Sequence, residues 1–284
     1  MSASDRKPEP LTLVFGFEEE WREFGRRHAE FMRRFPNIEK AIELAFNRSW
    51  GSTELLDRTL YFLGRLVQEE FMEILLLCAN GYGIGAQKLV RGMYERAVTA
   101  SYLRQHPEEV NNFLAFHKVA DHKLLKAVQS TFGDSLFTEV QVQQIEQDFA
   151  KVKEQFMITG CKVCNTRRLN HTWSKRDIVT MARMAGVLGS LIVPAYYLPT
   201  REAHSTIGAI FSRLDADAAT TDGALIFEGA AQRERADEAL ISAHNILLNV
   251  LDLENEHFQI KGLDEALQTC FEDFMISWSK SATK

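Results

Sequence analysis

Apolar residues recur three and four positions apart in almost every long segment of the chain, and strict alternation of apolar and polar residues is nearly absent. This period places apolar side chains on one face of an α-helix, whereas alternation would favour half-buried strands. The pattern predicts an all-α fold, a single multi-helix, bundle-like domain with long antiparallel helices. The expected helices cover residues 17–34, 52–79, 86–105, 107–131, 135–157, 175–192, 232–256 and 263–279.

Helix-breaking and capping residues set the expected boundaries. Pro36 is expected to stop the first helix, and the glycine cluster GYGIG, residues 81–85, is expected to form a turn between antiparallel helices. Ser174-Lys-Arg-Asp177 matches a capping box that opens helix 175–192. Thr200 is the natural N-cap of a further helix, which would carry His204 in its first turn.

Two stretches are expected to be non-helical. Residues 158–173 form a break, and ALIF, residues 224–227, has the composition of a short strand. No internal repeat or low-complexity linker divides the chain. The sequence therefore predicts a flexible polar tail over residues 1–12 and a single helical domain over residues 13–284.

Composition restricts the classes of function. The chain has 284 residues, of which 45% are hydrophobic, and a net charge of -6. That charge disfavours a protein that coats nucleic acid through its overall charge, although local basic patches are still allowed. The first residues, MSASDRKPEP, lack the apolar core of a secretory signal, so a cytoplasmic location is expected. The longest apolar run, residues 185–198, is shorter than the roughly 20 residues of a membrane-spanning helix, so no membrane partner is expected.

Metal-ligand patterns are incomplete in this sequence. Cys161-x-x-Cys164 followed by His171 resembles part of a zinc site, but tetrahedral closure needs a fourth ligand. Glu254-x-x-His257 is half of a di-iron signature, which would require the pattern twice. The expectation is therefore that the protein has no metal and no cofactor.

The segment GCKVCNTRRLNHTWSKR, residues 160–176, is basic and contains no acidic residue. Basic groups interleaved with an aromatic ring can hold a nucleic-acid backbone and stack a base. A solvated loop is the alternative. The candidate RNA-binding residues are Lys162, Arg167, Arg168, Trp173, Lys175 and Arg176.

His204, Arg91 and Glu95 are the other candidates for chemistry. In the first turn of a helix, the unpaired amides and the helix dipole would keep His204 neutral, as a general base requires. The structural alternative is that His204 braces a helix junction. Arg91 and Glu95 lie four positions apart on one helix, where they form either a structural ion pair or groups that face a cavity.

Two segments together carry a family resemblance. GAQKLVRGMYERAVTASYLRQHPE, and WSKRDIVTMARMAG followed by YYLPTREAHST, resemble an uncharacterised, mainly bacterial helical family that is defined as a domain of unknown function. That family has an Arg-x-x-x-Glu helix, then a Tyr-rich helix and a Ser/Thr-x-x-x-His-Ser/Thr turn. The matching positions here are Arg91, Glu95, Tyr196, Thr200, His204 and Ser205.

The arrangement is also distantly similar to HEPN-type helical proteins, several of which are metal-independent ribonucleases of toxin or defence systems. Those enzymes place an Arg four to six residues before a His at a dimer interface, which implies a homodimer. Here Tyr197, Leu198 and Pro199 occupy positions five to seven before His204, so Arg91 would have to substitute from another helix.

Two functions remain open from the sequence. In the first, the protein is an RNA-directed, metal-independent endoribonuclease in which His204 acts as general acid or base and Arg91 or Arg201 stabilises the anionic transition state. In the second, it is a non-catalytic helical module that binds a protein partner or small ligand, and Arg91, Glu95 and His204 form a structural network.

Overall fold

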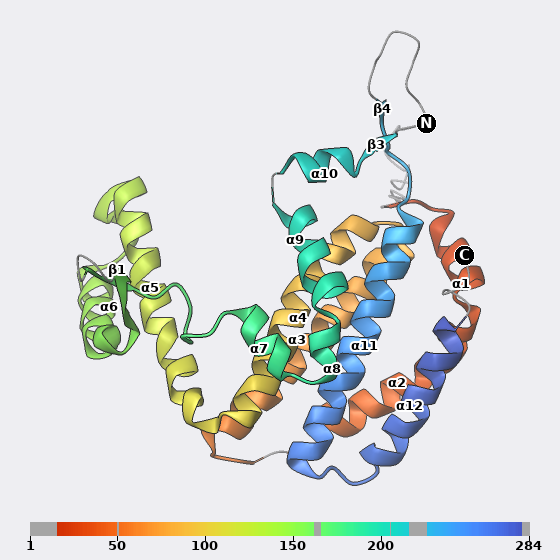
Figure 1. The fold of residues 1–284 in the computed structure, drawn as a ribbon, viewed down its shortest axis with the longest axis horizontal. Coiled ribbons are helices and arrows are strands. Elements are labelled where there is room, and N and C mark those ends of the chain that lie inside the picture. The colour runs from red at the N-terminus through yellow and green to blue at the C-terminus, as the bar shows by residue number, and fades with distance from the viewer. Residues whose placement is uncertain (1–15, 50, 162–165, 205, 216–225, 280–284) are drawn as a thin grey trace, which may run out of the picture. The chain divides into compact units, whose positions relative to one another are not determined.

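The computed structural model describes residues 16–49, 51–161, 166–204, 206–215 and 226–279. Long helices dominate these residues, so the prediction of an all-α, bundle-like fold is confirmed (Figure 1). The α-helices are α1 (Glu20–Arg27), α2 (Ala29–Phe46), α3 (Leu55–Ala79), α4 (Gly83–Gln105), α5 (Val110–Phe132), α6 (Glu139–Val152), α7 (Ile178–Met184), α8 (Val187–Ser190), α9 (Leu198–Ala203), α10 (Ile207–Phe211), α11 (Arg233–Phe258) and α12 (Leu263–Trp278).

Short elements connect these helices. The 3₁₀ turns are η1 (Pro107–Glu109), η2 (Gly133–Leu136) and η3 (Lys153–Phe156), and η4 (Val193–Tyr197) is a π-helical turn. Strands β1 (Met157–Cys161) and β2 (Thr166–Leu169) pair antiparallel, as do β3 (Leu214–Asp215) and β4 (Ile226–Phe227). β4 confirms the described part of the strand expected at ALIF; residues 216–225 lie outside the described residues.

The contacts divide the chain into two compact units, to which α3 and α4 both contribute residues. Unit 1 comprises residues 1–48, 66–94 and 191–284, and unit 2 comprises residues 49–65 and 95–190. The single helical domain over residues 13–284 stays a prediction, as does the polar tail over residues 1–12, which lies outside the described residues.

In unit 1, α2, α11 and α12 pack against one another, and η4 packs on α11 (Figure 1). The core is rich in aromatic side chains around the buried His244, whose Nδ1 accepts a hydrogen bond from Trp278 Nε1 at 3.1 Å. The rings of Phe31, Phe71 and Phe274 surround the same imidazole. Since burial lowers the pKa of His244 to about 3, this side chain is a neutral core residue.

Glu254 on α11 has a fully buried carboxyl group. Its nearest cation is Arg48, with Nη2 3.6 Å from Oε2, which is an ion-pair distance but too long for a hydrogen bond. Neither Glu254 oxygen has a hydrogen-bond partner in the described residues. Burial raises the pKa of this carboxyl to about 8, and the attraction to Arg48 opposes that rise.

The start of α4 lies directly against α11. Gly81 turns the chain with a φ of +78°, and its carbonyl accepts from Gln232 N at 3.0 Å. The amide of Ile84 then donates to Gln232 Oε1 at 3.1 Å. The expected glycine turn is therefore shorter than predicted, because Gly83 and Gly85 belong to the first turn of α4, where the absent Cβ at Gly83 allows the close approach.

Pro36 does not stop a helix, contrary to the prediction. α1 ends at Arg27, and α2 continues through Pro36 to Phe46. A proline removes one amide donor from a helix, and the buried side chains of Phe31 and Ile38 on either side hold α2 in place by packing.

In unit 2, α5 packs on α6 (Figure 1). The β1–β2 hairpin follows η3 and occupies most of the non-helical break that the sequence predicts over residues 158–173. The helix expected over residues 175–192 divides into α7 and α8. The predicted capping box is also wrong: the N-cap is Asp177, which accepts from Thr180 N at 2.7 Å, whereas Ser174 Oγ accepts from Arg176 N within the preceding loop.

Candidate functional site

Arg91 on α4 contacts two residues of the η4–α9 segment. Its Nε donates to Thr200 Oγ1 at 3.1 Å, and its guanidinium lies 5.2 Å from the centre of the Tyr196 ring. Thr200 Oγ1 in turn donates to Tyr196 O at 2.5 Å. The structure therefore brings together three of the residues that carried the family resemblance. Glu95 lies half-buried one turn after Arg91 on α4.

His204 occupies a different position from the one predicted. It follows the C-terminal end of α9, exposed and in extended backbone with φ −104° and ψ 151°. Thr200 is not an N-cap, because its hydroxyl bonds back to Tyr196 O and α9 begins at Leu198, directly after η4. His204 therefore lies away from the positive end of that helix, and the expected reason for a neutral imidazole does not apply.

Arg201 is exposed on α9, and its carbonyl accepts from Thr206 Oγ1 at 3.2 Å. Thr206 also caps α10, since Oγ1 accepts from Ala209 N at 3.3 Å. These two bonds connect α9 to α10. α9 also carries Thr200, which with Arg91 and Tyr196 forms what we call the Arg91 cluster.

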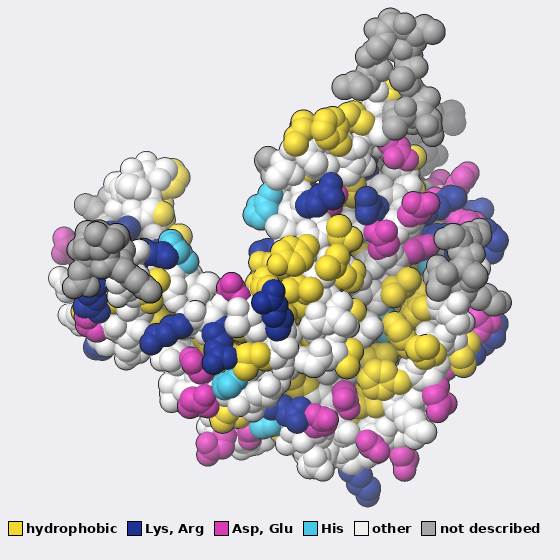
Figure 2. All heavy atoms as spheres, in the orientation of Figure 1, with side chains coloured by type: hydrophobic (Ala, Val, Ile, Leu, Met, Phe, Trp, Pro, Cys, Tyr) yellow, Lys and Arg dark blue, Asp and Glu magenta, His cyan; other side chains and the backbone are white. Residues whose placement is uncertain are grey.

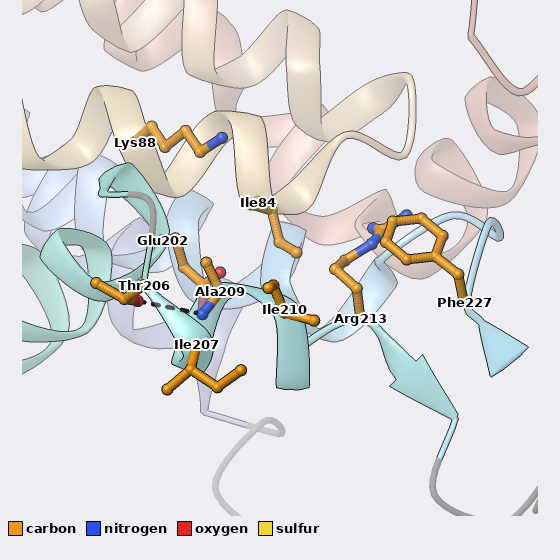
Figure 3. Close-up of a pocket in the computed structure, with 9 residues that line it drawn as sticks. All are labelled: Ile84, Lys88, Glu202, Thr206, Ile207, Ala209, Ile210, Arg213 and Phe227. Atoms are coloured by element: carbon orange, nitrogen blue, oxygen red, sulfur yellow. Dashed lines mark hydrogen bonds between the residues drawn. The ribbon is translucent and has the colours of Figure 1, made fainter. Parts of the chain in front are cut away.

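An open groove of about 620 Å³ lies between α4, α9, α10 and β4, wholly within unit 1 (Figure 3). Figure 3 shows Ile84 and Lys88 on α4 facing the residues of α9 and α10. The groove is lined by Ile84, Lys88, Glu202, Thr206, Ile207, Ala209, Ile210, Arg213 and Phe227. In the part of the chain that the structure describes, Arg91 and His204 do not line this groove.

The groove combines apolar surface with a few charges. The side chains of Ile207, Ile210 and Phe227 are all more than half exposed, and Figure 2 shows apolar side chains gathered over α10. Lys88 is exposed, whereas the Arg213 guanidinium lies 4.8 Å from the centre of the Phe227 ring. Glu202 is buried and accepts from Ser212 Oγ at 2.9 Å.

The candidate RNA-binding residues lie in unit 2. Arg167 and Arg168 are exposed on β2, and Arg167 pairs with Glu154 at 2.9 Å. The Arg176 guanidinium lies 5.8 Å from the centre of the Tyr102 ring and donates to Met184 Sδ at 2.9 Å.

Trp173 and Lys175 line one small cavity of unit 2 together, so the structure joins these two candidates. Lys162 lies outside the described residues. The structure leaves the proposed zinc ligands untested, because Cys164 and the side chain of Cys161 lie outside the described part as well.

Among the described residues, no three His, Cys, Asp or Glu side chains gather closely enough to hold a metal ion. Within the same residues, no helix combines the length and apolarity needed to cross a lipid bilayer.

The fold and the groove define an all-helical protein with an open, mainly apolar site beside a Tyr–Thr–Arg cluster. Residues 60–221, more than half of the chain, match the model of a family described as "Family of unknown function (DUF5677)". The chain belongs to this family. No curated protein and no solved structure matches it.

Proposed function

We propose that the protein is a non-catalytic helical binding module whose groove holds an amphipathic protein segment with acidic side chains. The observation that carries the proposal is the groove itself, which places exposed isoleucines of α10 between the cations Lys88 and Arg213. An amphipathic helix binds such a groove through apolar side chains one turn apart. Acidic side chains at its edge would face the two cations.

The extent of the apolar surface favours a macromolecular partner over a small ligand. Phe211 on α10 is 62% exposed and Ile226 on β4 is 41% exposed, and neither lines the groove. Apolar surface thus continues past the groove along both elements. Contiguous exposed apolar patches of this kind are typical of protein interaction sites.

The Arg91 cluster supports a binding function because its polar groups bond to each other. The Thr200 hydroxyl uses its one proton on Tyr196 O and accepts from Arg91. This half-buried network fixes the position of α9 against α4. We infer that the Arg91 cluster positions the wall of the groove.

The apolar part of the proposal is tested with a fluorescein-labelled 16-residue peptide that has leucines at helical spacing and glutamates elsewhere. We call this peptide the Glu peptide. We expect micromolar binding by fluorescence anisotropy. Ile207→Asp should weaken this binding at least 10-fold, or about 1.4 kcal/mol, because it places a carboxylate in the apolar contact. The matched control is Ile276→Asp on α12, another exposed isoleucine that does not line the groove.

The electrostatic part is tested by charge reversal at Lys88. Lys88→Glu should weaken the binding of the Glu peptide about 10-fold at low salt. It should strengthen the binding of a peptide in which lysines replace the glutamates. Lys40→Glu on α2 is the control, since Lys40 is also an exposed helical lysine. Equal effects of Lys88→Glu and Lys40→Glu, or no binding of either peptide, would contradict the proposal.

The ribonuclease hypothesis is decided by a separate measurement. Chelator-treated protein is incubated with labelled single-stranded RNA, and the native chain is compared with His204→Ala. We expect neither protein to cleave the RNA. If the native protein cleaves RNA without metal and His204→Ala does not, the proposed binding module is wrong and the protein is an RNA-directed nuclease.

A further inference from the structure

Unit 2 has a second cavity, which the binding function does not use. Its volume is about 120 Å³, and its polar and aromatic lining comes from Glu109, Asn112, Gln155, Trp173 and Lys175. A cavity of about 150 Å³ holds one benzene ring. This cavity is smaller than that, so it excludes the fused rings of a purine and would enclose a single six-membered ring only in part.

The loop that carries Trp173 and Lys175 is fixed by hydrogen bonds through Asn170. Asn170 N donates to Phe156 O, and Asn170 Nδ2 donates to Ser174 O, both at 2.8 Å. These bonds join the loop to η3, which contributes Gln155. The cavity wall is thus held together by contacts within unit 2.

The Trp173 ring is held in one orientation by two aromatic neighbours. The Phe113 ring lies 5.3 Å away at an interplanar angle of 86°, and the Tyr102 ring lies 5.8 Å away at 61°. Edge-to-face contacts of this kind are favourable. A fixed indole beside the cavity can contact a planar ligand without losing side-chain entropy.

The polar groups of the cavity define which ring fits. Glu109 Oε2 accepts from Asn112 Nδ2 at 3.1 Å, whereas Glu109 Oε1 makes no hydrogen bond in the part of the chain that the structure describes. The side chains of Gln155 and Lys175 also make none among those residues. The cavity therefore offers a carboxylate acceptor together with amide and ammonium donors.

We propose that this cavity binds a cytosine base, with its exocyclic amino group donating to Glu109 and its O2 carbonyl accepting from Lys175 or Gln155. A carboxylate accepts from the amino group of cytosine, whereas uracil presents a carbonyl oxygen at that position and is repelled. The same chemistry occurs in a free cytidine nucleotide and in an unpaired base of a strand.

The surrounding charge supports binding of a strand. Residues 49–65 and 95–190 hold 15 Lys and Arg and 12 Asp and Glu, in a chain whose totals are 33 and 39. Unit 2 is therefore the basic part of an acidic protein. The exposed Arg168 and Arg176 near the cavity can contact phosphates.

The test measures the anisotropy of fluorescein-labelled octamers of cytidine, uridine and adenosine with the full chain. We expect the cytidine octamer to bind at least 10-fold more tightly than the others. Glu109→Gln should bring the cytidine and uridine affinities within about 2-fold, because a glutamine amide can donate to the uracil carbonyl. The control is Glu108→Gln, which removes the same charge from a side chain that does not line the cavity.

A second variant covers the case in which Glu109→Gln lowers stability. Lys175→Gln changes an exposed loop residue. It should weaken binding of the cytidine octamer several-fold without lowering the melting temperature of the protein. Cytidine monophosphate that competes at the same concentration as the octamer identifies the free nucleotide as the ligand, and competition only at about 100-fold higher concentration identifies the strand. Equal affinity of the native protein for all octamers, or equal effects of Glu109→Gln and Glu108→Gln, would overturn the proposal.

Discussion

Replacing Gly83 with alanine is expected to lower the free energy of unfolding by about 3 kcal/mol. A Cβ at this position would lie 2.5 Å from Ala236 N and would also collide with the carbonyl oxygen of Gln232. Both are backbone atoms of the α11 start, so no side chain can rotate away. α4 and α11 would have to separate, and the hydrogen bond from Ile84 N to Gln232 would weaken.

Gly85 provides the matched control for this substitution. It lies in the same turn of α4, but its Cβ would meet only Leu77 Cδ1 at 3.7 Å and Tyr82 Cβ at 3.8 Å. Gly85→Ala should therefore stabilise the protein by up to about 1 kcal/mol through helix propensity. Urea denaturation of the three proteins measures both effects. Equal stability of Gly83→Ala and Gly85→Ala would show that α4 and α11 are not in close contact there.

The second large effect is a pH dependence of stability that arises at Glu254. Its pKa of about 8 in the folded protein lies above the value of 4.5 in an exposed carboxyl. Between these two pH values the folded state holds a proton that the unfolded state releases, so raising the pH favours unfolding. The stabilising contribution is complete below pH 4.5 and is lost as the pH rises through 8, with a slope of up to about 1.4 kcal/mol per pH unit.

Glu254→Gln tests this effect because the amide resembles the protonated carboxyl. The variant should match the native stability near pH 5, exceed it near pH 8, and show a flatter pH profile in urea denaturation. Glu234→Gln, on the exposed first turn of the same helix, should keep the native profile. If Glu254→Gln retained the native slope, the carboxyl of Glu254 would be ionised in the folded state.

The long helices could be predicted from the sequence because their apolar periodicity extends over many turns. α3, α11 and α12 begin and end within three residues of the expected bounds. Errors occur where a local signal competes with packing. Proline is typical of a helix end, but the buried side chains on both sides of Pro36 keep α2 continuous. The strands of the β1–β2 hairpin are too short to show the alternation of apolar and polar residues by which a strand is recognised in a sequence.

The Thr200 prediction failed because a threonine hydroxyl can bond forward as a cap or backward to the fourth preceding carbonyl, and the sequence does not distinguish these choices. The bond to Tyr196 O is the one that forms, and it moves His204 from the start of a helix to the end of one. The resemblance did identify Arg91, Tyr196 and Thr200 as a group.

The groove was not predictable from the sequence. It depends on α10 lying opposite Lys88, and these elements are more than 100 residues apart in the chain. The only local signal was the short run of exposed apolar residues in α10, which resembles a core segment when it is read as sequence. Trp173 and Lys175 were identified by composition, whereas Glu109 was missed because it lies in another segment.

The reaction rates of the two buried thiols of unit 1 can report how often the helices around them separate. Cys78 Sγ donates to Ala236 O at 3.2 Å, and burial raises the thiol pKa of Cys78 to about 12 and that of Cys270 to about 11. Only the thiolate alkylates readily, so each side chain should react only when the helices that cover it transiently separate. Mass spectrometry of iodoacetamide-treated protein would thus measure separately how often the contact of α3 with α11 opens at Cys78 and how often α12 exposes Cys270.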